Sequence, residues 1–262
     1  MTLRNPIGVV RRKLWGSFHR RVVPLGGRGP IVSFTFDDFP RSALTAGAPI
    51  LEKFGARGTY YVAMALMNQT NQLGEQFRLE DLYSLVERGH EVASHTFSHL
   101  SSHQAECEIF QRDAEDGERA IQENTGISAS HNFAYPYGEA TLKTKRALGR
   151  MMTSCRGTCA GLNGPDLDLN LLRANYLYGG VEKLEAAKQL ILRNEIRQRW
   201  LIFYTHDVSA HPSAFGCTPE LLEAAASFVA ERGVRMRTVA QVMGELAQHR
   251  TGQTVEKNFT TQ

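Results

Sequence analysis

Short apolar runs alternate with amphipathic stretches along most of the sequence. The apolar runs predict strands at residues 31–36, 58–63, 91–94, 132–135, 151–155, 172–177, 201–204 and 234–237. The amphipathic stretches predict helices at residues 43–54, 79–88, 104–125, 140–148, 181–193, 219–231 and 239–248. This alternation is typical of parallel strands that are buried beneath helices.

The number of strand–helix units indicates the architecture. About seven units follow one another, which favours an irregular (β/α) barrel of about seven parallel strands in a single domain. A doubly wound open sheet is the alternative. Local signals support several helix ends. Thr218, which precedes Pro219, and Thr238 can cap helix N-termini, whereas Gly89 and Gly233 can end helices.

Polar residues follow four of the predicted strands. They occur in SFTFDDFP, which contains Asp37 and Asp38, and in the stretches SHTFSH, YPYG and YTHD. Because the carboxyl ends of parallel strands meet at one face, we expect these residues to lie together. Two adjacent carboxylates repel each other unless a cation or a proton lies between them. The first stretch therefore requires a positively charged partner.

The stretch SHTFSH offers the ligands for such a cation. His95 and His99 are four residues apart, and on a helical turn this spacing directs both imidazoles to the same side. Two histidines and one carboxylate form a three-ligand site for a divalent metal, with open positions for water. We predict a metal site in which one of Asp37 and Asp38 binds the cation and the other acts as a base.

The order of the four stretches resembles a known family. TFDD, HTFSH, FAYPYG and THD follow one another as in the polysaccharide deacetylases of the NodB-homology type, which are carbohydrate esterases of family 4. The resemblance extends over residues 30–246 and implies the irregular barrel of that family. It also implies a metal-dependent hydrolase of carbon–nitrogen bonds that removes N-acetyl groups from a glycan. Exopolysaccharide, lipid-linked and chitooligosaccharide-like substrates all fit this expectation.

The resemblance also implies roles for single residues. The metal ligands, usually of zinc in this family, correspond to Asp38, His95 and His99. Asp37 resembles the general base, and His206 resembles the general acid that protonates the departing amine. In the step Pro136–Tyr137, the backbone N–H of Tyr137 would stabilise the oxyanion. Tyr135 and Tyr137 are also candidates for stacking on a sugar ring.

Two positions depart from the family pattern. Ala134 stands where many members have an arginine that pairs with the catalytic aspartate, and Arg156 or Arg173 could reach this place from another strand end. The family's fourth motif, whose aspartate tunes the acid histidine, has no clear match; Asp207 follows His206 but is expected to point away. These departures keep two alternatives open: a cyclic amide or imide hydrolase on the same fold, and a glycan-binding protein without catalysis.

The N-terminal stretch differs from the rest of the chain in charge. Residues 1–28 carry seven basic side chains and no acidic one, although the net charge of the whole chain is only +3. The remainder is therefore mildly acidic, which argues against nucleic-acid binding. Apolar residues are interleaved with the basic ones, so the stretch is either a surface helix on anionic lipid or a basic helix packed on its own domain.

The remaining features concern organisation and location. We divide the chain into a basic arm at residues 1–28, a deacetylase-like domain at 29–249 and a polar tail at 250–262. The sequence contains neither an apolar run of about 20 residues that could cross a bilayer nor the apolar segment of a secretory signal. We expect a cytoplasmic protein with reduced thiols at Cys107, Cys155, Cys159 and Cys217, in at most peripheral contact with a membrane.

Overall fold

A curved parallel sheet forms the centre of the protein. The computed structural model describes residues 18–127 and 130–248. Its seven parallel strands follow the order β10 (Asn175–Tyr176), β11 (Trp200–Thr205), β2 (Ile31–Asp37), β3 (Thr59–Val62), β6 (Glu91–Ser94), β7 (Asn132–Ala134) and β8 (Ser154–Arg156). A further strand, β12 (Arg235–Met236), pairs with the start of β2, whereas β3 pairs with its end.

Residues 172–176 span the gap between the two edges of this sheet. The N–H of Leu172 donates to the carbonyl of Cys155 over 2.7 Å, and the N–H of Gly157 donates back to Leu172 over 3.0 Å. Three residues later, Asn175 pairs with Phe203 of β11. The sheet is thus a half-barrel that this segment bridges, and the prediction of an irregular (β/α) barrel is confirmed.

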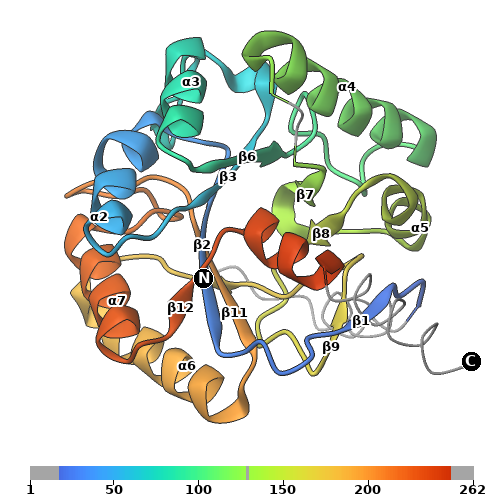
Figure 1. Cartoon of the computed structure of the whole chain (residues 1–262). Helices are drawn as coiled ribbons and strands as arrows, with labels where there is room; N and C mark the ends of the chain where they lie inside the picture. Colours follow the sequence, from blue (N-terminus) through green and yellow to red (C-terminus); the bar gives the residue numbers. More distant parts are fainter. Residues whose placement is uncertain (1–17, 128–129, 249–262) are drawn as a thin grey trace, which may run out of the picture.

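Helices surround the sheet on the outside (Figure 1). They are η1 (Ala43–Gly47) leading into α2 (Ala48–Lys53), α3 (Leu79–Glu87), α4 (Cys107–Thr125), α5 (Leu142–Met151), η4 (Val181–Lys183) leading into α6 (Leu184–Arg197), and α7 (Pro219–Glu231). A last helix over residues 239–248 lies in front of the barrel in this view. The predicted helix ends are confirmed. Thr218 accepts from the N–H of Leu221 and Thr238 accepts from that of Gln241, whereas Gly89 and Gly233 have positive φ after their helices.

Buried polar residues join the N-terminal ends of the strands. The carboxylate of Glu91 on β6 accepts hydrogen bonds from the Thr59 hydroxyl (2.8 Å), the Asn132 amide (2.7 Å) and the N–H of Ala240 (2.8 Å). Asn132 in turn accepts from Ser154 on β8 over 2.7 Å. Because Ala240 lies in the first turn of the last helix, this network fixes that helix across the end of the barrel.

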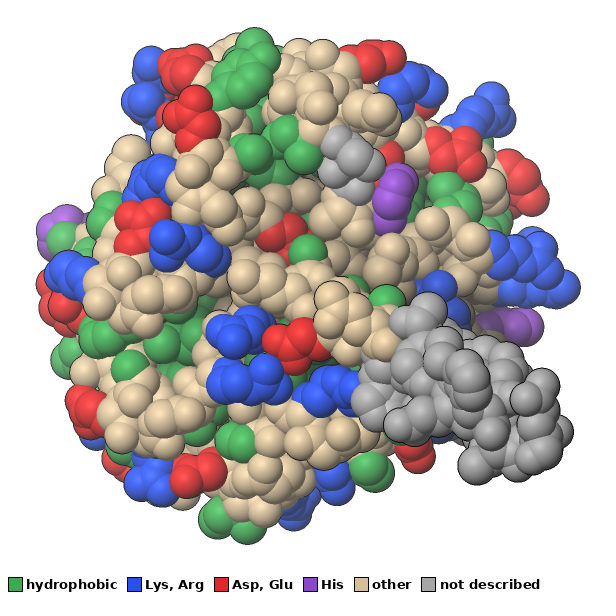
Figure 2. All heavy atoms as spheres, in the orientation of Figure 1, with side chains coloured by type: hydrophobic (Ala, Val, Ile, Leu, Met, Phe, Trp, Pro, Cys, Tyr) green, Lys and Arg blue, Asp and Glu red, His purple; other side chains and the backbone are tan. Residues whose placement is uncertain are grey.

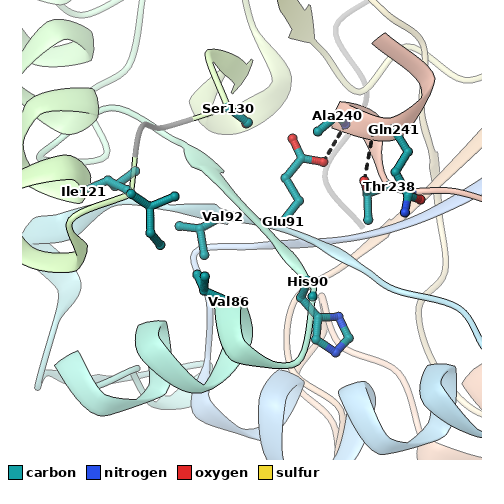
Figure 3. A pocket seen from close by; sticks show the side chains of 11 residues that line it. Val86, His90, Glu91, Val92, Ile121, Ser130, Thr238, Ala240 and Gln241 are labelled. Atoms are coloured by element: carbon teal, nitrogen blue, oxygen red, sulfur yellow. Dashed lines mark hydrogen bonds between the residues drawn. The ribbon is translucent and has the colours of Figure 1, made fainter. Parts of the chain in front are cut away.

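A cavity of about 290 Å³ lies beside this network (Figure 3). Its apolar lining includes Val86, Val92 and Ile121, and its polar lining includes Glu91 and His90. Both ring nitrogens of His90 already have protein partners, as do both oxygens of Glu91. Because Glu91 is the first residue of β6, the cavity lies at the N-terminal ends of the strands. The residues that the sequence singles out lie at the opposite, C-terminal ends.

Residues 18–28 pack on the barrel. Strand β1 (Val22–Pro24) pairs antiparallel with β9 (Asp166–Asp168), and Val23 and Leu25 are buried. The guanidinium of Arg21 donates to the carbonyls of Met152 and Thr153. This part of the predicted basic arm thus belongs to the domain, whereas residues 1–17 and 249–262, which include the predicted tail at 250–262, lie outside the described residues.

The surface over the N-terminal ends of the strands, where the last helix lies, carries charges of both signs (Figure 2). Arg235 and Arg237, for example, both pair with Glu245 of the last helix. No helix within residues 18–127 and 130–248 has the length and apolar character that a bilayer span requires. All four cysteines carry free thiols.

Candidate active site

The two adjacent aspartates lie where β2 ends. Asp37 is the last residue of the strand, and the next two residues, Asp38 and Phe39, are left-handed, with φ of 63° and 65°. Left-handed backbone costs about 1–2 kcal/mol for each residue that is not glycine. The Phe39 ring stacks on Phe77, with centroids 5.2 Å apart, and holds the turn in place. The abrupt turn allows neighbouring carboxylates to serve one site.

His95 and His99 are brought together by a loop. The prediction that a helical turn aligns them is wrong, because no helix covers residues 95–100. Instead, Thr96 and His99 are left-handed, with φ of 63° and 58°, and the Thr96 hydroxyl accepts from the N–H of Leu100 over 3.1 Å. The two imidazole centroids are 5.0 Å apart.

Helix α4 presses on this loop and fixes it. The carboxylate of Asp113 accepts from the N–H of Ser98 (3.1 Å) and from its hydroxyl (2.9 Å), and the Asp113 carbonyl accepts from Phe97 (2.9 Å). Gly117, one turn further along α4, permits the close approach. A Cβ at this position would lie 2.7 Å from the carbonyl carbon of Thr96.

Asp38, His95 and His99 converge on one point. One ligand atom from each lies within 4.8 Å of the others. The Nε2 atoms of His95 and His99 are 3.4 and 3.1 Å from Oδ1 of Asp38, yet this buried oxygen makes no well-formed hydrogen bond. A buried carboxylate oxygen without a hydrogen bond, with two imidazole nitrogens beside it, fits a divalent cation such as zinc.

The protonation of His95 and Asp38 suits a metal. The Nδ1–H of His95 donates to the carbonyl of Ala134 over 2.7 Å, which leaves the Nε2 lone pair directed at Asp38. Burial and the neighbouring His99 lower the pKa of His95 to about 4, so its imidazole is neutral. Burial acts to raise the pKa of Asp38, but close contact with His99 and the charges of His95, His99 and His206 hold it well below its ordinary value.

Arg156 pairs with Asp37 inside the barrel. Its Nη2 donates to Oδ1 of Asp37 over 2.5 Å, and both side chains are buried. The guanidinium lies over the rings of Tyr61 and Tyr204, 4.9 and 5.3 Å from their centroids. In the ladder between β7 and β8, Arg156 is the direct partner of Ala134. A guanidinium from the next strand thus lies beside the position where the family arginine is missing.

Arg173, the other candidate for this role, lies elsewhere. Its side chain is exposed and donates to the carbonyl of Ala160 over 3.1 Å. The strand segment on which it lies alternates inward and outward residues, and Ala174, which follows it, is buried. The predicted tuning role therefore does not fit Arg173.

The imidazole of His206 is held by a backbone carbonyl. Its Nδ1–H donates to the carbonyl of Phe215 over 3.1 Å, and its backbone N–H donates to the same oxygen over 3.2 Å. Asp207 accepts instead from the N–H of Ser213 (2.8 Å) and from its hydroxyl (2.5 Å). Asp207 thus stabilises the loop that supplies the carbonyl and does not touch the imidazole, so its predicted tuning of His206 is at most indirect.

The stretch YPYG places its two tyrosines on opposite sides. Tyr137 has a φ of 61°, is 62% exposed, and its ring centroid lies 4.7 Å from that of His99. It follows Pro136, which begins the short helix η3 (Pro136–Gly138). Tyr135 is buried against Phe110 and Phe133, and burial raises its pKa well above the ordinary value. The predicted sugar contact therefore fits Tyr137 and does not fit Tyr135.

Backbone strain gathers at the same place. The described residues include nine positions other than glycine with positive φ, and five of them lie in the three stretches described above: Asp38, Phe39, Thr96, His99 and Tyr137. Such residues persist only where the surrounding structure holds them, and they are frequent at functional sites. This concentration supports the assignment of the site independently of the side-chain chemistry.

Known proteins share this sequence pattern and fold. The family model described as polysaccharide deacetylase matches residues 26–153. The fold is similar to that of a putative polysaccharide deacetylase from Mycobacterium smegmatis, with a TM-score of 0.61 and 15% identity over 86% of this chain and 92% of that chain. It is also similar to a family 4 acetyl xylan esterase from Clostridium thermocellum in complex with a cobalt ion, with a TM-score of 0.54 and 20% identity over 82% of this chain and 91% of that chain.

A third similar structure is the peptidoglycan deacetylase PdaC from Bacillus subtilis, with a TM-score of 0.51 and 17% identity over 88% of this chain and 98% of that chain. No curated protein matches the sequence. At these identities the similar structures demonstrate the shared barrel, and the site's chemistry has to be argued from its own residues.

Proposed function

Because the chain belongs to the polysaccharide deacetylase family, we propose that it is a metal-dependent hydrolase that removes N-acetyl groups from a glycan. The observation that supports this most directly is the convergence of Asp38, His95 and His99 beside the buried pair of Asp37 and Arg156. A divalent cation held by the three ligands would supply the Lewis acidity that amide hydrolysis needs at neutral pH.

Asp37 is the general base of this proposal. Because Arg156 occupies Oδ1, the other carboxylate oxygen of Asp37 is the one that takes the proton of the attacking water. The fixed guanidinium keeps the carboxylate oriented, and general-base catalysis depends on such placement. Asp38, the next residue, is a ligand and takes no part in proton transfer.

His206 is the proposed general acid. Its Nδ1–H is committed to the Phe215 carbonyl, so Nε2 is the atom that carries a proton to the departing amine. An amine leaves slowly unless it is protonated, and imidazole is suited to this transfer. Tyr137, on the His99 side, would stabilise the oxyanion of the tetrahedral intermediate through its backbone N–H, an effect of roughly 3–4 kcal/mol for one good donor.

The position of Arg156 bears on the two alternative functions. A cyclic amide hydrolase and a non-catalytic glycan-binding protein both gain support only from the alanine at position 134. Arg156 lies on β8, next to the strand β7 that carries Ala134, and its guanidinium reaches Asp37. The alanine at position 134 therefore no longer indicates a lost or altered reaction. Deacetylation of a glycan is therefore the function that we favour.

The direct test is release of acetate. The purified protein, loaded with Zn²⁺ or Co²⁺, is expected to release acetate from N-acetylglucosamine oligomers, and chelation is expected to abolish the release. Asp37→Asn, which retains the three ligands, should bind the metal and release no acetate. Absence of acetate release by the metal-loaded protein from every N-acetylated and O-acetylated glycan tried would refute the proposal.

A further inference from the structure

Three aromatic rings lie together at one side of the candidate active site. Tyr176 and Tyr178 come from the end of β10 and the residues after it, and Phe215 comes from the loop that follows β11. The ring centroids of Tyr176 and Tyr178 are 5.2 Å apart, and those of Tyr178 and Phe215 are 6.0 Å apart. Tyr176 is 56% exposed and Phe215 is 49% exposed. We call these three residues the aromatic platform.

The platform adjoins the proposed general acid. The centroid of the His206 imidazole lies 6.0 Å from that of Tyr178 and 5.8 Å from that of Phe215. Tyr178 also packs edge-on against Tyr204, the ring that the guanidinium of Arg156 covers. The platform is therefore continuous with the proposed catalytic residues.

The loop that carries Phe215 is tightly held. Ser213 donates to Asp207 through its N–H and its hydroxyl, and its hydroxyl accepts from the N–H of Phe215 over 3.1 Å. Gly216 donates to Ser213 over 3.2 Å and accepts from Gly179 over 2.8 Å, so the loop is bound to the chain just after Tyr178. An exposed aromatic ring on a fixed loop is preorganised for a ligand, because little conformational entropy remains to be lost on binding.

A further exposed ring lies on the other side of the metal ligands. Tyr137 packs against His99, whereas the platform packs against His206. The rings thus flank the reacting groups on two sides, and a ligand that contacts both has to extend across the site. Sugar rings suit such surfaces, because their apolar C–H faces can lie on aromatic rings while the hydroxyl groups reach water or the tyrosine hydroxyls.

We propose that the aromatic platform binds a sugar ring next to the one that is deacetylated, so that the enzyme acts on oligosaccharide chains in preference to single sugars. This proposal rests on the proposed function, since it assigns a second part of the same substrate. The ring that is deacetylated would lie between Tyr137 and the platform.

Binding measured without turnover tests the platform. In an Asp37→Asn background loaded with Zn²⁺, calorimetry should detect binding of the tetramer of N-acetylglucosamine. Tyr176→Ala and Phe215→Leu, which leave the backbone intact, should each weaken this binding on the order of tenfold, as expected for the loss of one stacked ring. Tyr83→Ala, a change at an exposed tyrosine of α3, is the matched control and should leave the affinity unchanged.

Turnover gives a second measurement. In the parent protein, kcat/KM should be higher for the tetramer than for the monomer, and Tyr176→Ala should reduce this ratio mainly through KM. Undetectable tetramer binding, or equal affinities of the platform variants and the parent, would overturn the platform. If the tetramer binds through the platform and no glycan is deacetylated, the proposed function is refuted while the binding site stands.

Discussion

Arg156 on β8 reaches Asp37 on β2 through the interior of the barrel, from the strand position directly beside Ala134. The pair is buried, and the guanidinium also lies on the rings of Tyr61 and Tyr204. A charge pair in such surroundings contributes orientation more than net stability, because removing two charges from water offsets their attraction. Its value to the protein therefore lies in where it holds the Asp37 carboxylate.

Replacing Arg156 tests this relationship. Arg156→Ala should lower kcat strongly and destabilise the fold by about 3–5 kcal/mol, because Asp37 would remain buried without a partner. The double variant Ala134→Arg, Arg156→Ala should recover part of both losses, since its guanidinium would start from the adjacent strand. Activity and urea unfolding of the two variants are the measurements. A folded double variant no more active than the single one would contradict this account, and Arg173→Ala is the control that should change neither quantity.

Replacing Gly117 by alanine should weaken metal binding. In a helix, this change normally stabilises by up to about 1 kcal/mol. At Gly117, however, the new Cβ would lie 2.7 Å from the Thr96 carbonyl carbon, and the loop that carries His95 and His99 would have to move. We expect metal affinity to fall on the order of tenfold, the size of effect seen when the groups that orient metal ligands are changed.

Gly244 offers a matched control, since a Cβ there meets no atom within 4 Å and the residue lies in the last helix. Gly244→Ala should raise the free energy of unfolding and leave metal affinity unchanged. Equal effects of the two glycine variants on metal affinity, measured by competition with a chromophoric chelator, would show that close approach of α4 is not needed.

The loop held by Asp207 should matter only for reactions that need an acid. Asp207→Ala would release Ser213 and loosen the Phe215 carbonyl that orients His206. Hydrolysis of an N-acetylated sugar should then slow, whereas hydrolysis of 4-nitrophenyl acetate, whose leaving group needs no proton, should change little. Asp166→Ala, at an exposed site on β9, should affect neither substrate. A parallel loss on both substrates would indicate general disruption of the site.

His90 predicts a pH dependence of stability in the metal-free protein. Its Nδ1 accepts from the N–H of Gly58 and its Nε2 donates to Glu52, so the folded state holds a neutral imidazole. Burial lowers the pKa of His90, although Glu52 partly opposes this. Because the unfolded chain takes up the proton more readily, stability should be full above about pH 6.5 and decrease as the pH falls below that value.

Glu52 adds a second step at lower pH. Hydrogen bonds from Arg88 lower the pKa of Glu52 to about 2, with burial opposing. The contribution of ionised Glu52 to the free energy of unfolding should persist down to about pH 4.5 and be lost as the pH falls toward 2. Urea unfolding of the metal-free protein between pH 8 and 3 should therefore show both losses. His90→Asn, whose amide oxygen can accept from Gly58, should make the upper loss smaller, whereas His211→Asn at an exposed position should not. The part of the upper loss that remains is expected from His95, whose pKa is also lowered by burial.

The sequence predicted the fold well where apolar patterns were long enough. Strand β6 and helix α7 begin and end at the predicted residues, and the last helix begins at the predicted residue 239. The other predicted strands and helices all occur with one or both ends shifted. The strands β1, β4 (Thr70–Asn71), β5 (Gly74–Glu75) and β9 were not predicted. They contain two or three residues each, which is too short to show an alternation of apolar and polar residues, and their pairing depends on tertiary structure.

The site was predicted where side-chain type carried the information. Asp38, His95 and His99 could be named from their motifs, but the left-handed loop that joins the two histidines could not. The sequence did not distinguish Arg156 from Arg173, because that choice depends on strand register. The carbonyl of Phe215 was missed altogether, since every residue carries a carbonyl and only tertiary structure selects one.

Position 134 shows that the arginine that pairs with Asp37 need not come from one fixed place in the sequence. The Ala134 carbonyl orients His95, the proposed metal ligand, and the carbonyl of any amino acid at this position could do so. The Ala134 side chain is adjacent to Arg156, a place where an arginine on either strand can approach Asp37. Since the backbone and the side chain at this position act separately, a sequence can carry the arginine on either of these two strands while the proposed metal ligands keep their places.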